Sequence, residues 1–322
     1  MRTLQVLAPR SEFTIHELPV PVPAPDEVLV RIEGVATCPQ WDLHLRHNEP
    51  MFIGHRFVYP YGHGQPGHEA AGTVEAVGEA VTTLSLGDRV AAWRDPGPHV
   101  PGCYAEYVCR PAEHLIRVPA HLPIDDVASV ELAMCVAASV LRLRNMRLLG
   151  ARRAGVSGLG PAGLIAAQLL RAEGAGEIVG FDTVPARRDF ALHRGLVDAA
   201  HDPRDCPLPV RPHAAPALDI AIDCVGAATS VHFLLDRTAE IVALFGVQRE
   251  AYAFEVHHYP LILCGYPGHS RAAAEYAVGK IASGVLRLGL LITHRLPLSR
   301  YADGIALLER QEALKILFDP RA

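Results

Sequence analysis

Lysine and long apolar runs are scarce in this sequence of 322 residues. Only two lysines, Lys280 and Lys315, are present, so arginine carries nearly all of the positive charge, and the formal net charge is −5. A nucleic-acid-binding protein usually shows a basic patch, so this balance argues against nucleic acid as a partner. Because no uninterrupted apolar run reaches the roughly 18 residues that a membrane-spanning helix needs, we expect no membrane segment.

The first residues lack the apolar stretch of a secretory signal peptide. Without export, the seven cysteines should be reduced thiols, each of them either core filling or a metal or catalytic candidate. Half of the residues are hydrophobic and a fifth are charged, which indicates a globular chain, and the length is typical of two domains. We therefore expect a cytoplasmic protein of two domains.

Residues 1–130 alternate short apolar runs with proline and glycine. Such runs, separated by turn residues, predict a β-rich, barrel-like domain. The segment Leu18–Pro25 contains four prolines in eight residues and cannot be helical. The predicted strands are Val28–Ile32, Gly72–Val77, Arg89–Trp93, Tyr104–Val108 and Leu115–Val118.

From about Ala137 the pattern changes to strand, glycine turn and helix. Strands that alternate with helices predict right-handed crossovers and a mostly parallel sheet. The predicted strands are Glu177–Asp182, Leu218–Val225, Ile241–Val247 and Leu261–Gly265, and the predicted helices are Pro161–Glu173, Pro185–Arg194 and Ala227–Arg237. Two further helical patterns, Ser270–Ser283 and Ser299–Arg310, flank a predicted strand at Leu290–Leu296. The poorly apolar run Arg152–Ser157 is an unusual first strand for such a sheet.

Residues 158–163 fit the pattern G-x-G-x-x-G and open a predicted helix. Gly158 permits a tight turn, Gly160 lets the backbone approach a pyrophosphate, and Gly163 lets the helix pack closely on the strand. Pro161 and Ala162 complete the first turn, where a phosphate would meet the helix N-terminus. The alternative is an ordinary glycine-rich turn.

Asp182 ends the next predicted strand, nineteen residues after Gly163. A carboxylate at this place accepts hydrogen bonds from an adenosine ribose, and it would repel a 2′-phosphate. We therefore expect NAD as cofactor rather than NADP, although Arg187 and Arg188 could turn toward a phosphate. The alternative is that Asp182 is a plain cap.

Three segments carry candidate metal ligands: Cys38, the pair His68–Glu69, and the group Glu131 and Cys135. A thiolate, an imidazole and a carboxylate or second thiolate suit Zn²⁺, and three protein ligands leave a fourth position for water or a substrate oxygen. Single cysteines, histidines and glutamates are also common in ordinary cores and surfaces, so their spacing alone does not show whether they bind a metal.

Several motifs together resemble those of the zinc-dependent medium-chain alcohol and polyol dehydrogenases, and the likeness covers nearly the whole chain. The motifs are GHEAAG at 67–72 with Gly78 and Val81, GDRV at 87–90, the segment Gly34–Cys38, the glycine motif, Asp219 with DCVG at 223–226, and LITH at 291–294 with Leu298. The resemblance implies an α/β fold in which a doubly wound Rossmann domain, 136–268, is inserted in a β-rich, GroES-like catalytic domain of residues 1–135 and 269–322.

The resemblance also implies site residues. Cys38 and His68 correspond to zinc ligands, Glu69 to a carboxylate that can approach the metal, and Glu131 to the third ligand, with Cys135 as its rival. Lys315 matches a basic position that contacts the cofactor pyrophosphate, although it could also be a solvated lysine. The cofactor site would comprise the glycine motif, Asp182, Arg187, Val225 and Lys315.

The segment after Cys38 departs from the family pattern. Many members carry Ser or Thr two residues after the cysteine and His five residues after it, and these groups pass the substrate proton to solvent. Here Gln40 replaces the hydroxyl, and His44 is six residues away. An amide has no readily lost proton, so Thr37, a water or another route must serve. Asp42 resembles the family carboxylate that orients the zinc-bound histidine, here His68.

A second zinc is not expected, because a structural zinc lobe needs four closely spaced cysteines and only Cys103 lies between Val90 and Ala105. The loop between Cys38 and His68 is rich in His and aromatic residues. Its histidines either bind a metal or, as we expect, are neutral surface imidazoles, and its aromatic residues, with Trp41 and Trp93, either line a broad substrate pocket or pack the loop. These ring residues are His47, Phe52, His55, Phe57, Tyr59, Tyr61 and His63.

The leading hypothesis is a dehydrogenase with one catalytic zinc that transfers a hydride between NAD(H) and a secondary alcohol or polyol-like hydroxyl, or the corresponding ketone. Zinc lowers the pKa of a bound alcohol or polarises a carbonyl. Two alternatives are a C=C or C=N reductase without catalytic zinc and a non-catalytic nucleotide-binding scaffold. The partner is a small-molecule substrate, and the family likeness suggests a homodimer or homotetramer.

Overall fold

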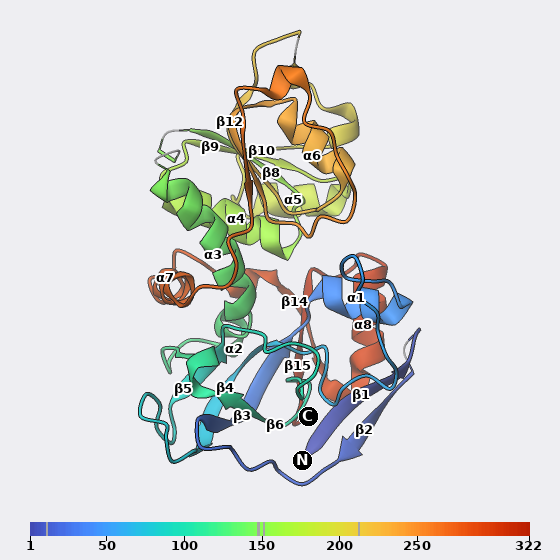
Figure 1. The fold of residues 1–322 in the computed structure, drawn as a ribbon, viewed down its shortest axis with the longest axis vertical. Coiled ribbons are helices and arrows are strands. Elements are labelled where there is room, and N and C mark those ends of the chain that lie inside the picture. The colour runs from blue at the N-terminus through green and yellow to red at the C-terminus, as the bar shows by residue number, and fades with distance from the viewer. Residues whose placement is uncertain (11, 147–148, 151, 212) are drawn as a thin grey trace. The chain divides into compact units, whose positions relative to one another are not determined.

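The strands of the computed structural model form three sheets within the residues that it describes, which are 1–10, 12–146, 149–150, 152–211 and 213–322 (Figure 1). The sheets belong to two compact units. The first unit comprises Met1–Met134 and Ala274–Ala322, and the second comprises Cys135–Ala273. No helix in the described part of the chain is long and apolar enough to cross a membrane.

The first unit contains a seven-stranded sheet in the order β14-β15-β3-β4-β5-β7, with β6 paired to β3, and a separate hairpin of β1 and β2. The sequence predicted the short strands of this unit, but it did not predict β1, β2 and β15. The strands are β1 (Arg2–Ala8), β2 (Glu12–Glu17), β3 (Glu27–Ala36), β4 (Glu69–Val77), β5 (Arg89–Ala92), β6 (Tyr107–Pro111), β7 (Leu115–Arg117), β14 (Ile292–Pro297) and β15 (Lys315–Asp319).

One predicted strand of this unit begins later than expected. The run predicted at Tyr104–Val108 becomes β6 only at Tyr107, because the backbone of Tyr104 is engaged elsewhere. Its N–H donates to the carbonyl of Gly64, and its carbonyl accepts from Leu4, each at 2.9 Å. The segment before β6 therefore connects the hairpin and a loop instead of extending the sheet.

Helix α1 (Pro39–His47) has recognisable start and stop residues. Pro39 occupies its first position, where the missing N–H is harmless, and Asn48 ends it in the left-handed region with φ of 55°. The other helices that begin or end in the first unit are α2 (Ile124–Val127), α3 (Val130–Asn145), α7 (Arg271–Ala282) and α8 (Tyr301–Glu309), with short 3₁₀ turns at η1 (Ala112–His114), η4 (Leu288–Leu291) and η5 (Leu298–Arg300).

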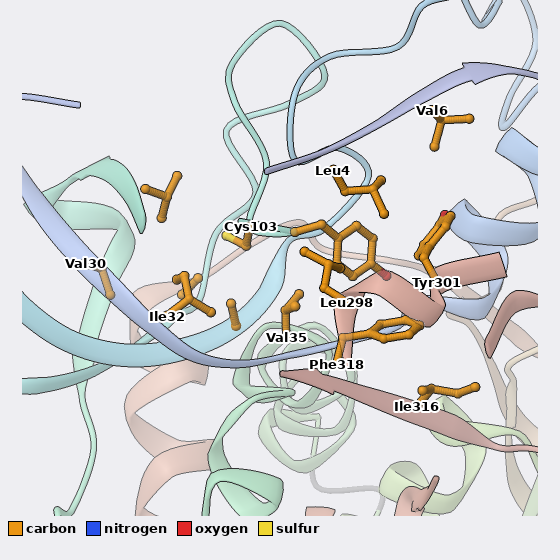
Figure 2. Packing of buried hydrophobic residues seen from close by; sticks show 14 of the residues in the cluster. Leu4, Val6, Val30, Ile32, Val35, Cys103, Leu298, Tyr301, Ile316 and Phe318 are labelled. Atoms are coloured by element: carbon orange, nitrogen blue, oxygen red, sulfur yellow. The ribbon is translucent and has the colours of Figure 1, made fainter. Parts of the chain in front are cut away.

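The core of the first unit joins segments from both ends of the chain. Figure 2 shows Tyr301 of α8 and Phe318 of β15 packed near Leu4 of β1 and Val35 of β3. Leu4, Val35 and Phe318 are fully buried. Burying each such side chain contributes about 1.5–3 kcal/mol to folding. The C-terminal residues are thus an integral part of the same unit as the N-terminal strands.

The second unit is built on a six-stranded parallel sheet in the order β10-β9-β8-β11-β12-β13. In chain order this is 3-2-1-4-5-6, the arrangement of a doubly wound dinucleotide-binding sheet, so the predicted fold class is confirmed. The strands are β8 (Arg153–Ser157), β9 (Glu177–Phe181), β10 (Ala199–His201), β11 (Leu218–Asp223), β12 (Thr238–Leu244) and β13 (Ile262–Gly265). The helices are α4 (Pro161–Ala172), α5 (Pro185–His193) and α6 (Ala228–Leu235), with 3₁₀ turns η2 (Pro203–Asp205) and η3 (Val256–His258).

The polar start of β8 has a local explanation. Arg152 and Arg153 lie at the entrance of the strand, where Arg152 pairs with Glu240 at 2.6 Å and Arg153 with Glu177 at 3.0 Å. The following residues of β8 are buried between the neighbouring strands. The charged residues that make this strand look too polar to be central are therefore confined to its exposed end.

Candidate functional site

Cys38 lies where strand β3 ends and helix α1 begins. It is the N-cap residue of α1, and its carbonyl oxygen accepts the N–H of Asp42 at 2.9 Å. The preceding residue, Thr37, is fixed in the sheet, since its hydroxyl oxygen accepts the N–H of Ile316 at 3.0 Å. The sulfur of Cys38 is thus held by a buried strand on one side and a helix on the other. Its thiol is half-buried.

His68 lies immediately before β4 and is buried. Its Nδ1 is 2.8 Å from the carbonyl oxygen of Pro66. A carbonyl can only accept, so Nδ1 carries the ring proton and the lone pair of the neutral ring is on Nε2. Nε2 lies 3.8 Å from Oε2 of Glu131. The Pro66 carbonyl therefore selects the tautomer that can bind a metal through Nε2.

The groups around His68 are anionic and stabilise positive charge at this place. Burial lowers the pKa of His68, but the hydrogen bond and charge of Cys38 and the charges of Glu131 and Asp95 outweigh it and raise this pKa well above its usual value. Cys38, His68 and Glu69 each offer one ligand atom, and these atoms lie within 4.8 Å of one another. Sulfur, imidazole nitrogen and carboxylate oxygen are the usual zinc ligands, so this donor set fits that metal.

Glu131 and Cys135, the two alternatives for the third ligand, lie one turn apart on α3. Glu131 is 6% exposed, and its carboxylate approaches His68 from the Nε2 side. Glu69 lies within the same group of donor atoms but is already occupied by a cation. The charged carboxylate that faces the lone pair of His68 is thus that of Glu131.

The cation that binds Glu69 is Lys315, whose side chain is fully buried in β15. Its Nζ donates to both carboxylate oxygens of Glu69, at 2.7 and 2.6 Å, and to the carbonyl of Thr37 at 2.6 Å. An ammonium group has three protons, and these partners use all of them. The expected contact of Lys315 with a pyrophosphate is therefore corrected to an internal ion pair, and the solvated alternative is wrong as well.

Asp42 does not contact His68 as expected. It lies on α1, 1% exposed, and its Oδ1 accepts from the hydroxyl of Tyr301 at 2.9 Å. The hydroxyl of Tyr104 donates to its Oδ2 at 3.0 Å. Because Nδ1 of His68 donates to Pro66 instead, the expected role of Asp42 is corrected: it fastens α1 to two tyrosines of the core.

The buried carboxyl of Asp42 predicts a pH-dependent stability. Burial raises its pKa from the ordinary 3.8 to about 6, although the two tyrosine hydroxyls and the charges of His68 and Lys315 lower it. Below the ordinary value the carboxyl is neutral in folded and unfolded chains, and above about 6 the folded chain holds a buried charge. Stability from this group is therefore lost as pH rises through this window.

We expect Asp42→Asn, which does not titrate, to gain about 3 kcal/mol relative to the wild type between pH 4 and pH 7. Urea unfolding at several pH values measures this difference. Glu79→Gln removes an exposed carboxylate and should show no such trend. A constant difference between Asp42→Asn and the wild type across the range would contradict the buried, raised pKa of Asp42.

Gln40 and His44 lie on α1, in its first and second turns. His44 is half-buried, and its Nδ1 is 3.1 Å from the carbonyl oxygen of Glu49 just beyond the helix. The structure thus places the amide of Gln40 near the start of the helix and turns His44 toward the end of it. A relay through these residues stays a prediction.

The aromatic residues of the loop before His68 pack chiefly on one another. Phe57 is in contact with His55, Trp41 and Tyr61, at ring-centre distances of 4.6, 6.1 and 5.5 Å. Phe57 and Tyr61 are buried in the core of the first unit. Trp93 is buried too, and its Nε1 donates to the carbonyl of Glu113 at 2.8 Å. These contacts favour loop packing over a broad aromatic pocket.

In the second unit, the glycine motif forms the turn between β8 and α4. Gly158 has φ of 84°, a conformation that suits glycine. Gly160 is the N-cap of α4, Pro161 is its first residue and Ala162 its second. A Cβ on Gly163 would lie 1.7 Å from the carbonyl oxygen of Gly158, whereas one on Gly160 would meet nothing within 4 Å. The motif has the geometry of a phosphate-binding turn.

Asp182 follows β9 and is bound to the glycine turn. Its Oδ2 accepts the N–H of Leu159 at 2.8 Å, and its Oδ1 accepts that of Val184 at 2.8 Å. Nη1 of Arg187 lies 3.7 Å from Oδ2. Val225 follows β11 and is 44% exposed. The sheet thus brings the glycine turn, Asp182 and Val225 to the carboxyl ends of adjacent strands, where such sheets bind ligands.

A further group of possible metal ligands, Asp236, His257 and His258, lies in the second unit. Nε2 of His257 and Nε2 of His258 are 3.1 and 2.8 Å from Oδ1 of Asp236. Nδ1 of His258 accepts the N–H of Glu255 at 3.1 Å, so the ring proton is on Nε2. With its proton there, Nε2 donates to Asp236 and has no lone pair for a metal. We therefore interpret this group as a structural hydrogen-bond network.

Sequence reasoning missed the tyrosines that hold Asp42 and the carboxylate of Asp95, whose Oδ2 lies 4.0 Å from Nδ1 of His68. Tyr104 and Tyr301 are 62 and 259 residues from Asp42 in the chain, so no local spacing connects them. The only signal for Asp95 was its position two residues after the predicted strand Arg89–Trp93, where loop residues often carry function.

A family model for the alcohol dehydrogenase GroES-like domain matches residues 24–120. Sorbitol dehydrogenase of Bombyx mori is 27% identical over 355 aligned positions, which cover 97% of each chain. An L-threonine 3-dehydrogenase of Chelativorans sp. (strain BNC1) is 24% identical over 99% of this chain and 98% of its own.

Among solved structures, the 2R,3R-butanediol dehydrogenase of Bacillus subtilis has the same fold. Its TM-score is 0.84 at 22% identity, and the match covers 99% of each chain. Similarity over the full length of both chains means that the two units, and not only the N-terminal one, are shared with these proteins.

Proposed function

Because the chain belongs to the zinc-dependent medium-chain family of alcohol and polyol dehydrogenases, we propose that it transfers a hydride between NAD(H) and a secondary alcohol or polyol-like hydroxyl, or the corresponding ketone. The observation that carries this proposal is the donor set of the first unit. There, the ligand atoms of Cys38 and His68 lie within 4.8 Å of each other, and the lone pair of His68 faces the carboxylate of Glu131.

We propose that Cys38, His68 and Glu131 hold one catalytic zinc and that the chain binds no structural zinc. When bound, zinc supplies a Lewis acid that lowers the pKa of an alcohol and polarises a carbonyl. The Pro66 carbonyl keeps the proton of His68 away from the metal side. Lys315 neutralises Glu69, so that the anionic donors left for the ion are the thiolate and Glu131.

We propose that the second unit binds the nicotinamide cofactor, with NAD preferred over NADP, and that the domain boundaries fall near residues 135 and 269. Gly158, Gly160 and Gly163 shape the turn for the pyrophosphate, and the buried carboxylate of Asp182 would repel a 2′-phosphate. Asp182 is held in place by the N–H of Leu159, so the adenosine ribose would meet a fixed acceptor.

Two glycine variants separate the steric role of the turn from its phosphate-binding role. Gly163→Ala should lower the free energy of unfolding by more than about 2 kcal/mol, because its Cβ would overlap the Gly158 carbonyl. Gly160→Ala should change it by less than about 0.5 kcal/mol but weaken NADH binding at least about tenfold, since its methyl occupies the approach of the phosphate. Chemical denaturation and NADH fluorescence titration measure the two effects. Equal losses of stability in Gly163→Ala and Gly160→Ala would contradict the separate roles of the two glycines.

Metal analysis and hydride-transfer assays test the proposed function together. The purified protein should contain one zinc per chain and should reduce NAD with members of a panel of secondary alcohols and polyols. Its kcat/KM with NAD should exceed that with NADP. Absence of zinc from the purified protein, with no gain of activity on adding zinc, would overturn the proposal.

One observation favours a second candidate, a C=C or C=N reductase that needs no catalytic zinc. Gln40 stands where a hydroxyl would pass on the substrate proton, and an amide cannot do so. A zinc-free Cys38→Ser variant that still reduced activated C=C or C=N bonds would support this candidate. Binding of NAD without hydride transfer to any substrate would point instead to a non-catalytic scaffold.

We also propose that the protein is a homodimer or homotetramer that associates through the outer edge of β13, the last strand of the parallel sheet. Large apolar side chains are exposed near this edge: Val256 is 89%, Tyr259 is 82% and Ile262 is 45% exposed. An edge strand with exposed apolar neighbours is suited to pairing with a second copy. Sedimentation velocity of the wild type and of Tyr259→Glu tests this, since the variant should shift toward the monomer.

A further inference from the structure

Near Nδ1 of His68, the described residues place one backbone oxygen and one carboxylate oxygen. The carbonyl of Pro66 accepts the Nδ1 proton at 2.8 Å, and Oδ2 of Asp95 lies 4.0 Å away on the same side. Asp42, the carboxylate expected there, is bound by two tyrosines. Asp95 is thus the acidic side chain that faces the proton-bearing side of this ring.

Asp95 is held in place by its own loop. Its Oδ1 accepts the N–H of Gly97 at 2.9 Å, which leaves Oδ2 directed to His68. The loop in turn is fastened by Gln65, whose Nε2 donates to the carbonyls of Gly97 and Val100 at 3.1 and 2.8 Å. Gln65 is 3% exposed and is three residues from His68, so the loop and the histidine share one anchor.

We propose that Asp95 is a positioning residue for His68: its carboxylate stabilises the Nδ1–H side of the ring and so strengthens the binding of zinc through Nε2. This inference rests on the proposed zinc site. A carboxylate behind a metal-binding histidine fixes the ring orientation and raises the basicity of the ligand nitrogen. Neither a family motif nor the spacing of the sequence indicated Asp95.

Competition between the protein and a zinc chelator tests this role, with Zn²⁺ itself as the probe. Asp95→Asn keeps an oxygen for the N–H of Gly97 and removes only the charge, so the loop should stay intact. We expect its zinc affinity to fall about tenfold, the lower end of the range for such outer contacts. The zinc-free variant should unfold at the same denaturant concentration as the zinc-free wild type, because the loop keeps its hydrogen bonds.

Three further measurements separate positioning from a general structural effect. Glu113→Gln removes an exposed carboxylate of the same unit and should leave zinc affinity unchanged. Asp95→Glu keeps the charge and should retain most of the affinity. Asp95→Ser, which also keeps an oxygen for the N–H of Gly97 but has no charge, replaces Asp95→Asn if that variant does not fold and should lose affinity to the same extent. In the Co²⁺-loaded protein, the thiolate-to-cobalt absorption band from Cys38 should persist in Asp95→Asn, because that ligand is untouched.

Failure of the wild type to bind zinc would overturn the proposed function itself. Tight zinc binding by the wild type with equal affinity in Asp95→Asn would overturn the role of Asp95 alone. Equal losses of affinity in Asp95→Asn and Glu113→Gln would also overturn it, because the effect would then be one of overall charge.

Discussion

Replacing Lys315 with methionine is expected to lower the free energy of unfolding by about 3–5 kcal/mol. The ammonium of Lys315 is fully buried and binds both oxygens of the equally buried Glu69. Burial and the charge of Glu131 raise the pKa of Glu69, and the charge of Lys315 opposes that shift. Without the lysine, the carboxylate would be a buried charge lacking its partner, or it would take up a proton, and the Thr37 carbonyl would lose its donor as well.

Chemical denaturation near neutral pH measures this loss, and the chain offers a matched control. Lys280 is its only other lysine, lies on α7 and is partly exposed, so Lys280→Met should change stability by less than about 0.5 kcal/mol. The double variant Glu69→Gln, Lys315→Met should be more stable than Lys315→Met, because both charges are then gone. A loss below about 1 kcal/mol for Lys315→Met would show that the pair does not form as described.

Replacing His68 with alanine is expected to abolish zinc binding and to lower kcat/KM for alcohol oxidation at least about a thousandfold, which corresponds to about 4 kcal/mol of lost transition-state stabilisation. The physical reason is that His68 contributes the only neutral ligand of the proposed set and the one with a fixed tautomer. Cys38→Ala should have an effect of the same size. Zinc analysis by mass spectrometry and steady-state kinetics are the two measurements.

Cys109→Ala is the matched control, because Cys109 is a half-buried thiol of β6 in the same unit, outside the donor set. It should keep its zinc and its activity. Glu131→Gln, Glu69→Gln and Cys135→Ser then identify the third ligand. We expect only Glu131→Gln to lower zinc affinity at least about a hundredfold; a loss of that size in Cys135→Ser instead would assign the position to the thiol.

The site could be predicted from the sequence in part. The motifs that contain Cys38 and His68 gave two residues whose ligand atoms lie within 4.8 Å of each other, because each is fixed by its own local segment: a strand end for Cys38 and the turn before β4 for His68. The glycine turn was equally local. The partners of these residues could not be predicted, because a pattern of spacing contains no information on which segments meet in space.

Asp42 and Lys315 show this limit most clearly. Both were assigned functional contacts by resemblance, and both turned out to make internal ones. Asp42 lies four residues from Cys38, but its partners Tyr104 and Tyr301 come from other segments. Lys315 meets Glu69 across 246 residues of chain. Burial then decides their charge states, and burial is a property of the assembled core.

By itself, the sequence determined the fold class, the helices and all strands but β10 of the parallel sheet, the glycine turn and the chemical types of the proposed metal ligands, since each of these depends on residues close together in the chain. Only the tertiary structure decided which carboxylate faces Nε2 of His68, which one pairs with a buried lysine and which one lies near Nδ1 of that histidine. Those outcomes depend on distances of a few ångströms between segments that are joined solely by packing.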